Sequence, residues 1–283
     1  MQYTIILTIL LLIVVLLTLF GCSKSKFNYN KPYYEPFINN EKNVYLLRTH
    51  VCSEQFYKLW YKIVDEFPIN RCFVIYDNTK ESLDTEFHNK YKDNIILHTL
   101  DDCKKINKYH DSMWYTVESS LCIAYDHIKE KVEFEYMWVI ENDIYTDGSL
   151  EKCFEIAEHI DDDYLATKIE DFNDNKEWAH WGELHGDMEN LEFDKQVRSF
   201  FPVVRCSKKM LELLKENLGV SSGFCEVYFP TLAKNNGLKY SNLPVDMLGN
   251  FEYLETVRLS TLPTNNDNKL YHKFVYELFK NKK

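Results

Sequence analysis

Glycine and proline are scarce in this sequence: its 283 residues include 8 Gly and 7 Pro. Low-complexity and collagen-like chains are rich in both residues, so extended disorder is not expected away from the termini. Three catalytic signatures are absent as well, because the chain contains no P-loop, no G-x-S-x-G turn and no H-E-x-x-H helix. These absences argue against P-loop nucleotide hydrolases, α/β-hydrolases and zinc peptidases.

Paired cysteines are missing too. The eight cysteines are spread along the chain, and none forms a C-x-x-C pair. A zinc knuckle or a dense disulfide framework would need closer and more regular spacing. Several of the cysteines fall on apolar faces, where a thiol behaves as a small hydrophobic group. We therefore predict buried free thiols.

Positive charge is in deficit, and the formal net charge is −11. A duplex-binding protein needs a basic face, so nucleic acid is excluded as the main partner. An acidic protein can still bind a nucleotide diphosphate, but only through a bound cation or a local basic patch.

Charge is absent altogether from residues 4–20, and this apolar stretch with its neighbours approaches the roughly twenty residues that span a bilayer. We predict a single-pass membrane anchor at residues 1–22 and a polar tether at 23–42, with a cleaved signal or lipoprotein peptide as the alternative. Lys24, Lys26 and Lys31 follow the span, and no Asn-x-Ser/Thr sequon occurs, which both favour a cytosolic body. The side of the membrane stays open.

The rest of the chain alternates between strand and helix patterns. This alternation is typical of βαβ units, so residues 43–283 are predicted to form one α/β domain with a mainly parallel central sheet flanked by helices. The expected strands are 43–51, 71–76, 94–100, 134–140, 164–168 and 198–205, and the expected helices are 54–66, 112–129, 149–160, 207–217 and 225–235.

The acidic tripeptide Glu141-Asn142-Asp143 directly follows the apolar strand 134–140. Ligands of open α/β sheets bind beyond the carboxyl ends of the strands, and residues two apart in an extended chain point the same way. Two converging carboxylates are hard-oxygen ligands suited to Mg²⁺ or Mn²⁺, with diphosphate oxygens and water completing the octahedron. The alternative is a solvated turn, for which Asn-Asp is ordinary chemistry.

The block WVIENDI at residues 138–144 resembles the acidic motif, D-x-D or E-x-D, of the GT-A nucleotide-diphospho-sugar transferases. Three further segments resemble a little-characterised branch of that superfamily: LLRTHV at 46–51, DYLAT at 163–167 and CEVYFPTL at 225–232. The resemblance covers residues 43–250 and implies a GT-A fold and a metal-bound nucleotide-sugar donor. Since Glu stands first in the motif, Asp143 is the safer metal ligand and Glu141 the less certain one.

The resemblance also implies donor-binding roles elsewhere. Asp77, which ends the second strand, matches the acid that contacts the nucleoside, although a plain turn residue is the alternative. Arg48 could meet a phosphate through its planar guanidinium or form an ion pair. Asp101, after the third strand, could line the donor cleft or lie in a solvated loop, and Asn142 is placed with these donor-binding residues.

An inverting transfer also needs a base for the acceptor hydroxyl. Glu226 is the first candidate because apolar neighbours raise the pKa of a carboxylate, and its alternative role is to complement the helix dipole. Asp246 and Asp187 are competitors, whereas a retaining mechanism would need no such base.

The segment 177–187 combines Trp178, His180, Trp181 and His185 with polar residues. Aromatic rings among polar groups suit sugar faces, so this segment could bind the acceptor. The two histidines could instead ligate a metal, but their spacing is a weak signal. The two tryptophans could also simply pack against the sheet.

The leading hypothesis is therefore a membrane-anchored, metal-dependent glycosyltransferase that moves a sugar from a nucleotide-sugar to a glycan, protein or lipid acceptor. One alternative is a nucleotidyltransferase or phosphoesterase. A nucleotidyltransferase would have a glycine-rich basic loop after the first strand, and a phosphoesterase would have a richer His/Asp cluster. A non-catalytic binding module, tethered to a membrane and with the same fold, is the third.

Overall fold

The computed structural model describes residues 41–109, 115–252 and 267–274, all within one unit, Ile38–Lys283. The expected anchor at 1–22 lies outside the described residues, as does the expected tether up to residue 40. Among the helices that are described, none has the length and apolar content needed to cross a bilayer.

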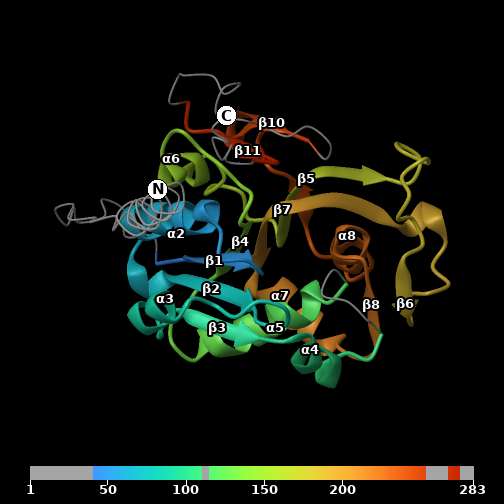
Figure 1. The fold of residues 1–283 in the computed structure, drawn as a ribbon. Helices are drawn as coiled ribbons and strands as arrows, with labels where there is room; N and C mark the ends of the chain where they lie inside the picture. The colour runs from blue at the N-terminus through green and yellow to red at the C-terminus, as the bar shows by residue number, and fades with distance from the viewer. Residues whose placement is uncertain (1–40, 110–114, 253–266, 275–283) are drawn as a thin grey trace, which may run out of the picture. The chain divides into compact units, whose positions relative to one another are not determined.

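A seven-stranded sheet with the strand order β3-β2-β1-β4-β7-β5-β9 forms the centre of this unit (Figure 1). All neighbouring pairs are parallel except those of β7, which runs antiparallel to both β4 and β5. The predicted mainly parallel α/β sheet is thus confirmed. Its strands are β1 (Asn43–Thr49), β2 (Cys72–Asp77), β3 (Ile95–His98), β4 (Tyr136–Glu141), β5 (Tyr164–Asp171), β7 (Val197–Ser207) and β9 (Tyr240–Asn242).

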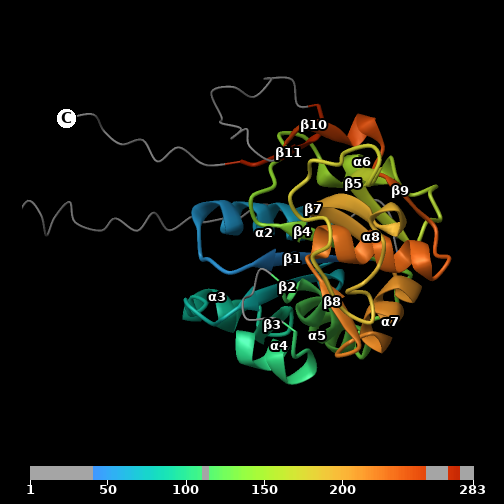
Figure 2. The ribbon, with the colours of Figure 1, turned by 90° about the vertical axis from the view of Figure 1, so that its right-hand side faces the viewer.

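Helices cover both faces of the sheet. Strand side chains alternate between the two faces, so Leu46 joins the core under one helix layer and Leu47 the core under the other. One layer contains α2 (Glu54–Glu66), α3 (Thr85–Lys90) and α6 (Leu150–Glu155), and the other contains α5 (Val117–Lys129), α7 (Lys208–Glu216) and α8 (Cys225–Asn235). Figure 2 shows α2 and α6 on the side of β1 and β4 opposite α5 and α7.

The elements that the pattern did not predict are short. The helix α4 (Leu100–Ile106) begins where a loop was expected, because Thr99 and Asp102 form a reciprocal capping box. The remaining short elements are the strand pairs β6 (Leu184–Gly186) with β8 (Ser221–Gly223) and β10 (Leu248–Phe251) with β11 (Leu270–His272), and the 3₁₀ turns η1 (Ile69–Arg71), η2 (Phe193–Lys195) and η3 (Val245–Met247).

The cysteines agree with the prediction of buried free thiols. All seven described cysteines are free, and six of them are buried, with Cys52 partly exposed. Burial raises the pKa of Cys103 and of Cys206 to about 12, so both groups stay as thiols near neutral pH.

The core at β4 leads to a stability prediction. Val139→Ala removes two methyl groups from a fully buried site and is expected to lower the free energy of unfolding by about 1.5–3 kcal/mol. Val245→Ala is the matched control, because Val245 is 79% exposed and its loss should change stability by less than about 0.5 kcal/mol. Urea unfolding of the two variants checks this, and equal losses would contradict the described core.

Candidate functional site

The strand order reverses between β1 and β4. From β1 the chain adds β2 and β3 on one side, and then returns to place β4 on the other side of β1. Ligands of open α/β sheets bind outside the carboxyl ends of the strands at such a reversal. The residues at these ends of β1 and β4 are Arg48 and Glu141, which are direct partners in the strand register.

Arg48 and Glu141 form an ion pair. Arg48 Nη1 donates to Glu141 Oε1 at 2.6 Å, and the two side chains are 22% and 27% exposed. Burial raises the pKa of Glu141, and the nearby Asp143 carboxylate raises it further, while Arg48 and His272 oppose the shift. Glu141, expected as a metal ligand, is therefore already neutralised by a side chain of the neighbouring strand.

Asp143 lies beside His272, which comes from β11 far along the chain. The Oδ2 atom of Asp143 is 3.3 Å from His272 Nε2. His272 Nδ1 is 3.0 Å from the carbonyl oxygen of Glu252, and since a carbonyl only accepts, Nδ1 carries a proton and donates. The second ring nitrogen, Nε2, therefore faces the Asp143 carboxylate.

The sequence reasoning missed His272. No motif or regular spacing connects it to the acidic tripeptide. The backbone of Tyr271 pairs with that of Tyr145, and Phe274 N donates to the Asp143 carbonyl oxygen, which brings His272 there. The sole signal was the short segment LYHKF at residues 270–274, whose Leu, Tyr and Phe could have been taken as part of a strand.

The pair formed by Asp143 and His272 offers a place for a divalent cation. Within the described part of the chain, Asp143 Oδ1 is buried and has no hydrogen-bond partner. An unsatisfied buried carboxylate oxygen next to an oriented imidazole nitrogen fits a cation better than an ordinary turn. The described residues contain no group of three or more His, Cys, Asp or Glu side chains that could hold a metal, so the protein donor set found here has two members.

The expected donor-binding acid, Asp77, ends β2 on the other side of β1. Its Oδ1 accepts a hydrogen bond from Thr79 N at 2.9 Å, which is the plain turn role foreseen as its alternative. The pKa of His98, at the end of β3, is lowered by burial, raised by Asp77 and lowered again by Arg48. These electrostatic effects connect Asp77 and His98 to the Arg48 end of the sheet.

Two further donor-binding candidates lie in less defined surroundings. Asp101 is exposed in the first turn of α4, in a helix rather than in the expected loop. Asn142 is partly exposed in the turn between Glu141 and Asp143.

Glu226 lies in the first turn of α8 and is 5% exposed. Its Oε1 accepts a hydrogen bond from Phe201 N of β7 at 3.3 Å. Pro230, four residues on, has no N–H to donate to the Glu226 carbonyl, and Ser199 Oγ donates to that carbonyl instead at 3.4 Å. Contacts from β7 therefore hold this turn in place.

The neighbouring Cys225 shows that this turn is close to the ion pair. Burial raises the pKa of the Cys225 thiol, Glu226 and Glu141 raise it further, and Arg48 lowers it. The competing base candidates are both exposed: Asp246 in η3, and Asp187 after β6.

The aromatic segment lies next to the start of α8. The His180 ring is 4.5 Å from the ring of Phe224, and its Nδ1 is 2.9 Å from Glu183 Oε1. The Trp178 ring packs against Arg198, whose guanidinium is 5.2 Å away. His180 and His185 belong to no metal-holding group among the described residues.

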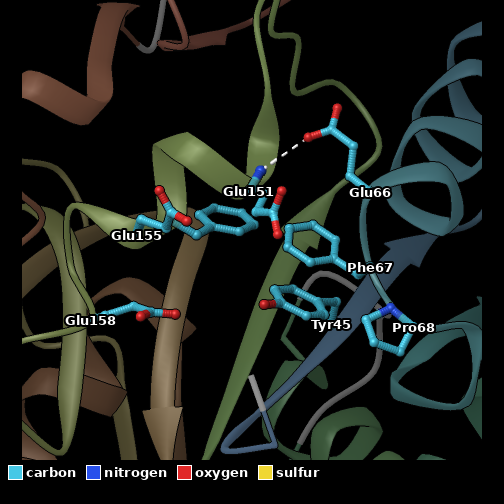
Figure 3. Close-up of a pocket in the computed structure, with 8 residues that line it drawn as sticks. Tyr45, Glu66, Phe67, Pro68, Glu151, Glu155 and Glu158 are labelled. Atoms are coloured by element: carbon cyan, nitrogen blue, oxygen red, sulfur yellow. Dashed lines mark hydrogen bonds between the residues drawn. The ribbon is translucent and has the colours of Figure 1, made fainter. Parts of the chain in front are cut away.

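An acidic pocket lies between α2 and α6 (Figure 3). Tyr45 of β1, three residues before Arg48 in that strand, lines it. Glu151 N donates to Glu66 Oε2 at 3.0 Å in this pocket. Burial raises the pKa of Glu151, and Glu155, Glu66 and Glu158 raise it further. Repulsion from these glutamates disfavours a diphosphate here. The lining residues are Tyr45, Glu66, Phe67, Pro68, Glu151, Phe154, Glu155 and Glu158.

The described residues thus define an α/β protein with a charged polar site at the switch point of its sheet. No family model matches the sequence, and a search of curated proteins finds no match.

Three solved structures are similar to part of this chain. A putative glucose-1-phosphate thymidylyltransferase from Bacillus anthracis is 10% identical, with 71% of this chain and 87% of that chain covered and a TM-score of 0.40. The bifunctional IspDF from Campylobacter jejuni is 13% identical, with coverages of 71% and 49% and a TM-score of 0.37. The bifunctional glycosyltransferase WbbM is 11% identical, with coverages of 80% and 41% and a TM-score of 0.42. Two of the three are named as transferases.

The raised pKa of Glu141 predicts a pH effect on stability. The folded state holds this proton more tightly than the unfolded chain, so the resulting stabilisation is present below pH 4.5 and is lost as pH rises through the raised pKa. Glu141→Gln does not titrate, and its melting temperature should therefore improve relative to wild type as pH rises from 4.5 towards neutrality.

Glu192→Gln is the control. The pKa of the exposed Glu192 is lowered, so this group is ionised in the folded state throughout that window, and in the unfolded chain from about one pH unit above its ordinary pKa. From that pH upwards, its variant should run parallel to wild type in a series of melting curves at different pH. A curve for Glu141→Gln that runs parallel to wild type would show that burial does not raise the pKa of Glu141.

Proposed function

We propose that this chain is a metal-dependent glycosyltransferase that takes a sugar from a nucleotide-sugar donor. The observation that carries the proposal is the Asp143–His272 pair at the carboxyl edge of β4, with one carboxylate oxygen left unsatisfied among the described residues. It lies beside the sheet's switch point, where nucleotide ligands of open α/β folds bind.

The charge of the protein supports a bound cation. A chain of net charge −11 repels a diphosphate unless positive charge is concentrated at the site. Asp143 and His272 would hold the cation, and Arg48 adds a fixed positive charge beside them. One carboxylate and one imidazole favour Mn²⁺ over Mg²⁺, which prefers oxygen ligands. When bound, the cation supplies charge neutralisation for the departing diphosphate.

The chain's own residues then orient the donor and accept a proton. Glu226 is assigned as the base, so that the acceptor hydroxyl loses its proton to this carboxylate while its oxygen attacks the sugar carbon. The bond between that carbon and the phosphate oxygen breaks, and the nucleoside diphosphate leaves. The acceptor is a hydroxyl group of a glycan, a protein or a lipid.

The connection after β1 favours glycosyl over nucleotidyl transfer. Only residues 50–53 separate β1 from α2, and they contain no glycine, lysine or arginine. Thr49 Oγ1 forms hydrogen bonds with the backbone N–H and carbonyl of Val51, and Ser53 caps α2. This short, ordered connection leaves no long loop to enclose a triphosphate.

Donor binding is the direct test. Nucleotide-sugars that bind only the folded state raise its melting temperature, so we expect a UDP- or GDP-sugar to do so only with Mn²⁺ present. Asp143→Asn should abolish the Mn²⁺-dependent rise. Asp147→Asn, an exposed acid four residues on, should retain it.

A rise that survives in Asp143→Asn would exclude the proposed cation site. If no nucleotide-sugar stabilises the wild type, the non-catalytic binding module becomes the better description.

The base assignment gives a separate prediction. With the donor identified by melting temperature, Glu226→Gln should lower the turnover rate by about 10²–10⁴-fold, the usual contribution of a general base. Its donor-induced rise in melting temperature should be unchanged, because the donor contacts remain. The measurement is release of nucleoside diphosphate over time. The reverse result, with Asp246→Asn slow and Glu226→Gln normal, would reassign the base to Asp246.

A further inference from the structure

Lys168 of β5 adopts a backbone conformation that is unusual for a residue with a side chain. Its φ is 52°, in the left-handed region that favours glycine and asparagine. Such residues persist where the surrounding structure imposes the conformation, and they cluster at ligand-binding and active sites. The position of this residue is therefore informative about its role.

The strand register shows what the conformation does. Thr167 of β5 pairs with Phe200 of β7, but Glu170 pairs with Arg198, so the ladder shifts across Lys168. Irregularities of this kind turn a side chain away from its regular direction, often next to active sites.

The Lys168 side chain shares two neighbours, Glu252 and Phe200, with His272. Lys168 Nζ forms an ion pair with Glu252, the residue whose carbonyl oxygen accepts from His272 Nδ1. The same Nζ lies 5.7 Å from the centre of the Phe200 ring, and that ring packs edge-on against the His272 ring at 4.9 Å.

The register shifts place Lys168 beyond the carboxyl end of β4. Ile140 of β4 pairs with Val203 of β7, whereas Thr167 of β5 already pairs with Phe200, and both strands run antiparallel to β7. Arg48 on β1 and Lys168 on β5 lie on opposite sides of β4 in the strand order.

A purely structural tie between β5 and β10 explains these facts less well. The Lys168 and Glu252 side chains are 26% and 52% exposed, and ion pairs with such access to water contribute little to stability. That gain alone gives no reason for a strained backbone at this residue. A phosphate-binding role does, because it requires the charge at this particular place.

We propose that Lys168 binds the diphosphate of the donor, and that phosphate oxygens replace the Glu252 carboxylate as its partner when the donor enters. This inference rests on the proposed function and adds a phosphate ligand to the same site. It makes Glu252 a competitor of the donor rather than a ligand.

The test measures binding of UDP, GDP and CDP to the full chain by calorimetry with Mn²⁺, with uridine, guanosine and cytidine as probes that lack phosphate. Lys168→Asn is the informative variant, because asparagine tolerates the left-handed backbone and removes the ammonium. We expect at least a tenfold loss of affinity for the bound diphosphate, no change for the nucleoside, and an unchanged or higher melting temperature without ligand.

Lys234→Asn is the matched control. Lys234 Nζ forms an ion pair with Asp171 at 2.8 Å, and the two side chains are 31% and 55% exposed. Asp171 is the last residue of β5, the strand that contains Lys168. This variant removes a similar ion pair and should keep its diphosphate affinity within twofold of wild type.

Glu252→Gln tests the exchange from the other side. It removes the competing carboxylate and keeps the backbone carbonyl that orients His272, so diphosphate affinity should rise. Wild-type affinity in Lys168→Asn, or unchanged or weaker affinity in Glu252→Gln, would overturn the proposal. If wild type binds no nucleoside diphosphate with Mn²⁺, the proposed function itself fails, and that result is distinct from a loss confined to Lys168→Asn.

Discussion

The ion pair between Arg48 and Glu141 is the interaction on which the arrangement of the site depends. It joins the carboxyl ends of β1 and β4 at the point where the strand order reverses. Without Arg48, Glu141 would stand next to Asp143 with only His272 to offset two negative charges, and the raised pKa of Glu141 shows that burial already disfavours its ionised form. The guanidinium thus allows an acidic motif to exist at this edge of a buried sheet.

Two further contacts between an acidic side chain and a nitrogen group lie near this edge. The His272 imidazole faces Asp143, and the Lys168 ammonium meets Glu252, so both carboxylates have a nitrogen partner within the protein. A cation and a diphosphate that enter together bring both signs of charge and can exchange partners with these pairs. An acidic chain can bind a polyanion in this way without a basic surface.

Periodicity alone located the larger elements, although α6 ends at Glu155 rather than at the predicted residue 160. Helix α2 spans the predicted residues 54–66, because Phe56, Leu59, Trp60 and Ile63 form one apolar stripe and Ser53 caps the first turn. Strand β4 is buried along its middle, as its unbroken apolar run indicated. Short elements escaped prediction, since three or four residues, as in β8 and β11, contain too little pattern to identify a strand.

The sequence by itself determined the α/β class, the mainly parallel sheet and the place of the acidic tripeptide at a strand end, because these follow from local periodicity and from chain direction. Tertiary structure alone decided which side chains meet there. His272 reaches Asp143 because β11, far along the chain, pairs with the backbone of Tyr145 as well as with β10, and Lys168 is redirected by a shift in strand register. Neither contact leaves a local signal, since both depend on how distant segments pack, and packing is a property of the folded chain as a whole.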